Sequence, residues 1–476
     1  MLEELGRFFL FMRPAFSRRA AYGWFVIVCA GFLLRQDDYG VSSIVRALAL
    51  PPATYLCLLH FFHSSAWTVA GLMPLWWQWL QKADVAWRQS GRLVLVGDHT
   101  KVPKDGRRMP AVATLHQDSE TASKPSFFRG HHWGAIALLV RARDKYFATP
   151  LWASIHEGTE SLAASTPLPK TILIVQMAQR VARTMGNAVY LVLDAYFSVG
   201  TVFSAAAREK TDDQQPLVHI LTRAKKNVVA YRPAPPALKK KRGRKKLYGK
   251  KLKLMRLFDA KKKSFAFQQA EALIYHRREV IRFLVLDLLW KPTRGLIRFI
   301  LVESSRGRMI IMSSDLLIAP VPAVELFCHR VSIESMFNAL KNLLGGLAYH
   351  FWSRYLYPVS RRPKKQDGSV RPSLRPAKTR VTLAAIEKFV NLQLLVLGTI
   401  QIIAVLLPEK VALKSRCWLR TVSSKTPSEF VTRMALAQTM KSNLAAFGKD
   451  WITQLIRRKQ NIRVKSSKKH IDKKAA

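Results

Sequence analysis

The sequence predicts an α/β protein in which helices flank a mixed sheet, with an N-terminal helical domain and an insertion within the fold. Two short apolar runs, at 92–97 and 188–193, each lead to an aspartate, as buried strands that deliver an acid would. A segment with helical spacing lies between them, at 170–185, and stops before a Gly-Asn pair. A basic low-complexity stretch at 239–253 marks the insertion.

Charge is the strongest feature of the composition. The chain has 476 residues, with 78 Lys and Arg against 30 Asp and Glu, which gives a net charge of +48. A charge of this size calls for a polyanionic partner, and nucleic acid is the leading candidate. Anionic lipid is the alternative, but it would favour one basic cluster beside a spanning helix. Here the basic residues are spread from Arg7 to Lys474.

Cysteine usage and the two most apolar stretches indicate the compartment. The four cysteines are far apart and lack zinc-site spacing, so we expect a reducing compartment and no structural zinc. The apolar stretches 24–34 and 392–407 fall short of the roughly 20 residues that a bilayer needs. We expect buried core helices there and no membrane partner, although a membrane protein built on both stretches is a rival hypothesis.

The elements follow in order along the chain. The first 88 residues have helical spacing between prolines. Strands at 133–141 and 146–155 flank a turn and predict a hairpin. Later strands are expected at 295–302 and 308–313, and a continuous helix from about 321 to 344. The predicted domains are an N-terminal helical DNA-binding domain at 1–88, a catalytic core at 89–216 and 295–357, a basic insertion at 217–294, a basic linker at 358–380, a helical region at 381–456 and a basic tail at 457–476.

Three acids are the candidate catalytic residues. Asp98 and Asp194 each follow a predicted buried strand, and Glu334 lies within the helix at 321–344. At 100° per residue, the helix places Phe327, Arg330, Glu334, Asn338 and Lys341 within an arc of about 80°. A surface helix with ordinary charge pairs would show the same pattern. Five other acids lack this combination of positions: Asp105, Asp118, Asp287, Glu303 and Asp315.

The helix also carries a family resemblance. Its pattern Phe327-x2-Arg330-x3-Glu334-x6-Lys341 resembles the Tyr-x2-Arg-x3-Glu-x6-Lys signature of DDE-type insertion-sequence transposases, which belong to the RNase H-like and retroviral-integrase superfamily. Phe327 stands where that signature has Tyr. The segments around Asp98 and Asp194 look like the first-acid and second-acid strands of these enzymes, and 242–249 is similar to a basic stretch in their insertion domain.

The resemblance implies a reaction and the residues that perform it. Asp98 and Asp194 would bind and bridge two Mg²⁺ or Mn²⁺ ions and Glu334 would ligate one, which suits the hard oxygen donors that two-metal phosphodiester chemistry needs. The enzyme would cleave DNA at transposon ends and transfer strands into target DNA. The partners implied are double-stranded DNA, as terminal inverted repeats and target, and a second copy in a synaptic homodimer. The predicted DNA-binding residues are Arg330, Lys341, Lys101, Arg242, Arg244 and Lys245.

Several alternatives stay open at this stage. A decayed transposase copy that only binds DNA is the rival function, since Phe327 lacks the hydroxyl of the signature Tyr. The pair His131-His132 cannot readily chelate one ion, because neighbouring strand residues point to opposite faces. The tryptophans at 76, 77 and 79 suit either base stacking or a helical core. No glycine-rich phosphate loop is present, so ATP dependence is not indicated.

Overall fold

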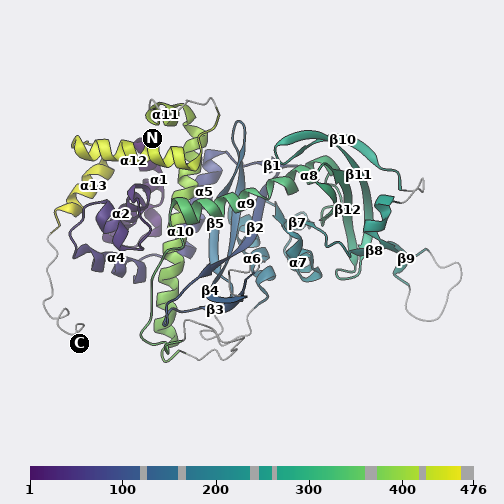
Figure 1. Ribbon diagram of the computed structural model, residues 1–476, viewed down its shortest axis with the longest axis horizontal. Helices are drawn as coiled ribbons and strands as arrows, with labels where there is room; N and C mark the ends of the chain where they lie inside the picture. Colours follow the sequence, from purple (N-terminus) through teal and green to yellow (C-terminus); the bar gives the residue numbers. More distant parts are fainter. Residues whose placement is uncertain are drawn as a thin grey trace.

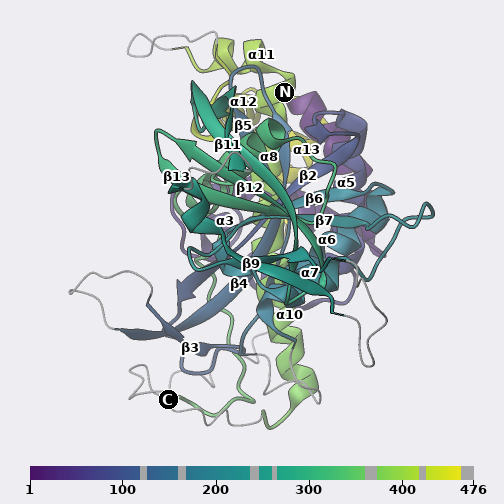
Figure 2. The same cartoon turned by 90° about the vertical axis from the view of Figure 1, so that its right-hand side faces the viewer.

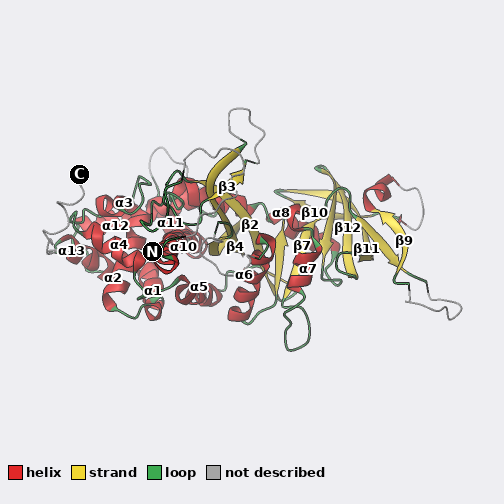
Figure 3. Ribbon diagram, turned by 90° about the horizontal axis from the view of Figure 1, so that it is seen from below, coloured by secondary structure: helices red, strands yellow, loops and turns green. Residues whose placement is uncertain are grey.

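The computed structural model describes residues 1–117, 126–158, 168–235, 246–259, 265–359, 373–416 and 425–462. The molecule is elongated, with a helical lobe at one end, the catalytic sheet in the middle and a β-rich lobe at the other end (Figure 1). The view from below separates the helices from the strands in the same way (Figure 3). Four residues singled out by the sequence lie outside the described residues: Asp118, Arg242, Arg244 and Lys245.

The helical lobe combines the start and the end of the described chain. Its buried centre is α2, in which almost every residue from Gly23 to Leu34 is buried. The indole nitrogens of Trp76 and Trp77 donate to the carbonyls of Pro150 and Leu151, at 2.8 and 3.1 Å, so both rings fix α5 to the sheet and belong to the core. The elements are α1 (Leu2–Phe11), η1 (Arg13–Ala15), α2 (Arg19–Leu34), α3 (Ser42–Ala47), α4 (Thr54–His63), α5 (Val69–Ala83), α11 (Pro408–Lys414), α12 (Glu429–Ala445) and α13 (Trp451–Gln460).

The central sheet has the strand order β5-β4-β2-β6-β7. The first three strands are antiparallel neighbours, whereas β6 pairs parallel with β2 and with β7, a mixed sheet consistent with the RNase H-like fold. The predicted hairpin is confirmed as β4 and β5. The strands are β1 (Arg88–Gln89), β2 (Arg92–Pro103), β3 (Ala113–His116), β4 (Phe127–Arg141), β5 (Tyr146–Ile155), β6 (Val189–Leu193) and β7 (Val218–Arg223).

Helices cover the faces and one edge of this sheet. The predicted helix at 170–185 is confirmed as α6 (Lys170–Met185), which ends at Gly186 with a φ of 60°, in the left-handed region that glycine favours. It packs on β4, β6 and β7 beside α7 (Gly200–Ala206). The long helix α10 (Pro376–Leu406) runs along the outer strand β5 (Figure 1). Asn391 both accepts from the amide of Ala153 and donates to its carbonyl, which closes the open edge of β5.

The apolar run at 392–407 belongs to α10, and its prediction needs one correction. The helix spans 31 residues and is the one helix in the described ranges long and apolar enough to cross a membrane by length and composition. The expectation that this segment is too short is therefore wrong. The expectation of a core helix is confirmed, because 89% of its most apolar window is buried against β5, α2, α4 and α12. The other run lies in α2, which is also buried.

The β-rich lobe continues the central sheet. Strand β13 pairs antiparallel with β7, so the described strands form one 13-stranded sheet, and its β-rich end faces the viewer in Figure 2. Strand β7 pairs with β6 although it lies in the segment 217–294, which was predicted as the insertion. The predicted division of the chain into seven segments stays a prediction. The elements are β8 (Val229–Pro233), β9 (Tyr248–Lys253), η4 (Leu254–Asp259), β10 (Gln268–Ile274), β11 (Arg277–Trp290), β12 (Gly295–Ser304) and β13 (Gly307–Ser313).

The helix expected from 321 to 344 is not continuous. It consists of α8 (Pro320–His329), α9 (Ser332–Asn338) and a π-helical turn, η6 (Ala339–Leu343). At the break the amides of Ile333 and Glu334 bond to carbonyls three residues earlier, at 3.1 and 3.0 Å, and the Ser332 hydroxyl donates to His329. These bonds between residues three apart replace the regular i to i−4 hydrogen bonds at Arg330. The prediction of one continuous helix with a single functional face is therefore wrong.

Candidate active site

The two aspartates lie at the same edge of the central sheet. The parallel pairing of β2 with β6 ends at Val96 and Val192, and Asp98 and Asp194 follow two residues later on each strand. Asp98 is not at a strand tip as the sequence suggested, because β2 continues to Pro103 by pairing with β4. Burial raises the pKa of Asp98 to about 6, and the charges of Asp194 and Glu334 add to this rise.

A short helical turn fixes the second aspartate. The Asp194 carboxylate accepts from the amide of Tyr196 at 3.0 Å and so caps η3 (Ala195–Phe197). Its main-chain carbonyl accepts from the hydroxyl of Thr222 on β7. Burial also raises the pKa of Asp194, and the charge of Glu334 adds to this effect while Arg330 opposes it. The strand and the cap together hold the carboxylate at the end of β6.

Arg330 joins the remaining acid to this edge. Its Nη1 donates to the Oδ2 of Asp98 at 3.1 Å, and its Nη2 donates to the Oε1 of Glu334 at 2.9 Å. Arg330 sits at the break between α8 and α9, so its side chain reaches the sheet while Glu334 stays 57% exposed. The structure therefore brings Asp98, Asp194, Glu334 and Arg330 together from separate segments of the chain.

The other signature residues occupy different environments. The Nζ of Lys341 donates to the hydroxyl of Thr100 on β2 at 2.7 Å, and desolvation lowers the pKa of its ammonium group. The Nζ of Lys101 donates to the carbonyl of His116 at 2.8 Å. Phe327 is only 8% exposed and packs in the core, so it does not share the exposed face that the helical arc predicted. Its apolar ring suits that buried position.

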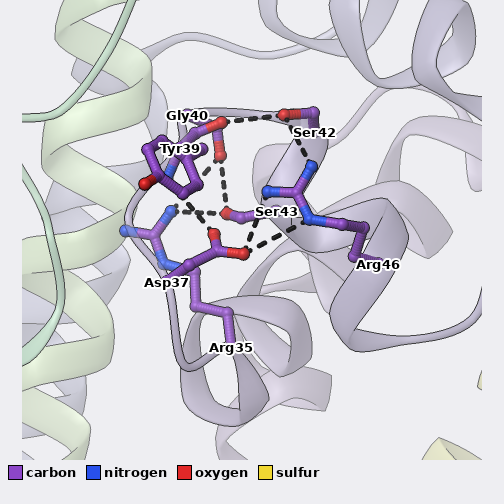
Figure 4. A network of polar contacts seen from close by, with 7 residues as sticks. All are labelled: Arg35, Asp37, Tyr39, Gly40, Ser42, Ser43 and Arg46. Atoms are coloured by element: carbon purple, nitrogen blue, oxygen red, sulfur yellow. Dashed lines mark hydrogen bonds and ion pairs between the residues drawn. The ribbon is translucent and has the colours of Figure 1, made fainter.

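A buried arginine, Arg35, and a half-buried one, Arg433, hold the far end of the helical segment that carries Glu334. Arg35 follows α2 and, in the loop drawn in Figure 4, donates to Gly40 and Ser43. It also donates to the carbonyls of Leu344 and Gly345, directly after η6, while Arg433 donates to that of Leu343. Positive charge at a helix C-terminus is favourable. The helical lobe thereby anchors the segment that carries Glu334 and Lys341.

A group of histidines lies behind the aspartates and was not singled out as a site by the sequence. His99 lies next to Asp98 and contacts His156, and burial lowers the pKa of these imidazoles to about 2 and about 3. Both rings are therefore neutral at neutral pH. His132 pairs with Glu157 at 2.6 Å, whereas His131 bonds to Tyr349 and Pro110, so the two neighbours point apart as predicted.

The acids that the sequence set aside lie in ion pairs or outside the site. Asp287 pairs with Arg298 at 2.8 Å on the β-rich lobe, and Glu303 pairs with Arg282 at 2.7 Å. Asp315 accepts from Arg92 at 3.0 Å and is 4% exposed. Their carboxylates are occupied by partners that belong to the framework of the fold, so none of the three joins Asp98.

The donor chemistry of the site fits a divalent cation. Three carboxylates come from β2, from the end of β6 and from α9. Burial raises the pKa values of both aspartates, and the charge of Glu334 adds to the rise. Carboxylate oxygens are the hard donors that Mg²⁺ and Mn²⁺ prefer. Within the described ranges no three His, Cys, Asp or Glu side chains are already grouped as a metal site. The guanidinium of Arg330 instead supplies the positive charge between Asp98 and Glu334.

A mixed sheet of this order, with one aspartate on β2 and another directly after β6, is consistent with an RNase H-like DDE fold. The chain belongs to the DDE superfamily endonuclease family, whose model matches residues 12–277, more than half of its length. This match includes Asp98 and Asp194 and ends before Glu334, so the third acid rests on the contacts of Arg330. A comparison with curated proteins gives no match.

Proposed function

We propose that the protein is a DNA transposase that cleaves DNA at transposon ends and transfers the freed strands into target DNA. The observation that carries this proposal is the bridge made by Arg330 between Asp98 and Glu334, beside Asp194. Asp98 and Asp194 are far in the sequence from Arg330 and Glu334, and these contacts support the site that the resemblance to the transposase signature implies. Membership in an endonuclease family supports the same reaction class.

The carboxylates have distinct tasks in this reaction. Asp98 and Asp194 would hold two Mg²⁺ or Mn²⁺ ions between them, and Glu334 would complete the coordination of one. When bound, the ions supply activation of a water or a 3′-hydroxyl and stabilisation of the leaving oxygen. The amide of His99, 2.8 Å from the Asp98 Oδ1, fixes the orientation of that carboxylate. The cap on η3 does the same for Asp194.

The basic residues bind and orient the DNA. Arg330 and Lys341 flank the carboxylates and neutralise phosphates near the cut. Lys101 lies further along β2 and, by the alternation of strand side chains, on the face opposite Asp98, so its proposed DNA contact is away from the carboxylates. Further contacts are proposed for Arg242, Arg244 and Lys245, which lie outside the described residues. A net charge of +48 makes binding to double-stranded DNA strongly dependent on salt. The homodimer around paired transposon ends, acting in the prokaryotic cytoplasm, is part of the same proposal.

A cleavage assay tests the proposal. Purified protein is incubated with a labelled duplex that carries the end of its own element, with Mg²⁺, Mn²⁺ or EDTA. The expected result is metal-dependent nicking at the end, lost in a Glu334→Gln variant that still binds the duplex. Specific binding without cleavage in any metal would refute the proposed enzymatic activity and favour a decayed copy that only occupies its terminal repeats.

A further inference from the structure

The strand β2 presents different chemistry on its two faces. Side chains alternate along a strand, so Asp98 and Thr100 point to the face of α9, where they contact Arg330 and Lys341. His99 points to the opposite face, where α6 packs, and contacts His156 there. The candidate catalytic carboxylate and this histidine are therefore consecutive residues that act on separate faces of the sheet.

The histidine contact is built into three adjacent strands. The Nε2 of His99 lies 3.1 Å from the Nδ1 of His156, whose Nε2 lies 3.1 Å from the hydroxyl of Ser154. Gly134 on β4 pairs with His99 on one side and with Ser154 on the other. A Cβ at Gly134 would overlap the His156 ring, so the glycine leaves the space through which His156 reaches His99.

His99 also contacts the segment that carries the second aspartate. Its ring stacks on Phe197 with a centroid distance of 5.3 Å and an interplanar angle of 12°. Phe197 is fully buried and belongs to η3, the turn that the Asp194 carboxylate caps. His99 thus contacts the Asp194 turn with its ring, while its own amide donates to Asp98. One residue connects both aspartate-bearing segments.

We propose that His99, held by His156, is a positioning residue that sets the separation of Asp98 and Asp194 and so tunes the affinity of the site for a divalent ion. The inference rests on the proposed function, since it assigns a purpose to the spacing of those carboxylates. Neither histidine ligates the ion. The hydrogen bond between His156 and His99 fixes the tilt of the His99 ring, and the ring fixes Phe197 and its turn relative to β2.

Two variants of His156 separate hydrogen bonding from packing. His156→Phe fills a similar volume without a hydrogen bond, and His156→Gln retains a polar group within reach of His99. Removing such an outer hydrogen bond costs about 10- to 100-fold in metal affinity. The Mn²⁺ dissociation constant, measured by electron paramagnetic resonance on the full chain without DNA, is expected to rise by about this factor in His156→Phe. It is expected to stay within about threefold in His156→Gln.

Gly134→Ala provides an independent test, because it displaces His156 without altering either histidine. It is expected to weaken Mn²⁺ binding as His156→Phe does. Circular dichroism and the thermal midpoint establish that each variant is folded at the assay temperature. The proposal is overturned if folded His156→Phe binds Mn²⁺ like the wild type, or if His156→Gln loses as much affinity as His156→Phe, since packing alone would then explain the effect.

The same titration in Glu334→Gln distinguishes this proposal from the proposed function. Weaker binding in Glu334→Gln together with unchanged binding in His156→Phe overturns only the positioning role. Wild-type protein that binds no Mn²⁺ overturns both, because there is then no ion for the carboxylates to hold.

Discussion

The two faces of β2 perform opposite tasks with neighbouring residues. On the α9 face, burial raises the pKa of Asp98 to about 6, and the like charges of Asp194 and Glu334 add to this rise. On the α6 face, His99 lies among imidazoles that burial keeps neutral, in a closed hydrogen-bond chain with His156. The charged face is under electrostatic strain that a bound cation would relieve, whereas the neutral face is satisfied as it stands.

This contrast explains how a rigid framework can hold an unfavourable site. Like charges near one another raise the free energy of the folded protein, and the surrounding structure has to prevent their separation. The neutral face contributes hydrogen bonds and ring stacking that do not change across the physiological pH range. Arg35 and Arg433 contribute in a similar way to the segment that carries Glu334.

The largest effect is expected from removing charge on the α9 face. Asp98→Asn and Asp194→Asn should each lower the rate of strand cleavage by about 10³-fold or more, which corresponds to about 4 kcal/mol. DNA affinity measured without metal should not fall, because a repulsive carboxylate is removed. The matched control is Asp287→Asn, which breaks an ion pair with Arg298 on the β-rich lobe and should leave the cleavage rate unchanged. Equal losses in all three variants would contradict the site.

The pH dependence of metal binding separates the two faces next. A raised carboxyl pKa means that protons compete with the ion, so Mn²⁺ affinity should decrease by about tenfold per unit as pH falls below about 6. The groups facing Asp98 that shape this midpoint are Asp194, Glu334 and Arg330. His156→Phe should show the same midpoint as the wild type, since His156 stays neutral throughout this range. Titrations from pH 5 to 8 measure the midpoint in both proteins. A Mn²⁺ affinity that stays unchanged down to pH 5 would refute the raised pKa of Asp98.

A smaller effect is expected from Lys341, at the border of the charged face. Its ammonium group donates to Thr100 and points toward the strand that carries Asp98. If it neutralises one phosphate, Lys341→Ala should reduce the slope of log affinity against log salt by about one, with a several-fold loss in affinity for any duplex. Fluorescence anisotropy across a salt series measures this slope. Lys410→Ala, on the exposed surface of α11, is the control, and an unchanged slope in Lys341→Ala would remove Lys341 from the DNA surface.

The sequence predicted the elements whose signals are local. The apolar run before Asp194 and the helix that ends at Gly186 were found at nearly their observed bounds, because periodicity and a glycine stop operate within a few residues. The extension of β2 beyond Asp98 was missed, since His99 to Lys101 are polar and become strand only by pairing with β4. The helix break at Arg330 was missed because neither proline nor glycine marks it.

The candidate site was predicted only in part, because contacts between distant segments leave no local signal in the sequence. Glu334 and Arg330 were identified through their resemblance to a signature, and Arg330 contacts both Asp98 and Glu334 in the structure. The His99 contact joins three strands, and no local pattern announces it. The only local signal is Gly134, a small residue within the apolar run of β4. It indicates space for the His156 ring only once its pairing with His99 and Ser154 is known.

The smallest expected effect is on stability, and it measures the strain of the charged face directly. The folded pKa of Asp98 is raised, so the folded protein binds more protons than the unfolded chain, and its stability decreases as pH rises from about 4 to about 6. Asp98→Asn abolishes this penalty, although its single amide oxygen can accept only one of the two hydrogen bonds, either from Arg330 or from the amide of His99. Without metal, its thermal midpoint at pH 7.5 should exceed that of the wild type by about 1–3 °C. At pH 4 the difference should vanish, because the wild-type carboxyl is then protonated. Asp287→Asn, which loses an ion pair and no repulsion, should show no such gain, and a gain in Asp98→Asn that persisted at pH 4 would assign the effect to packing instead of charge.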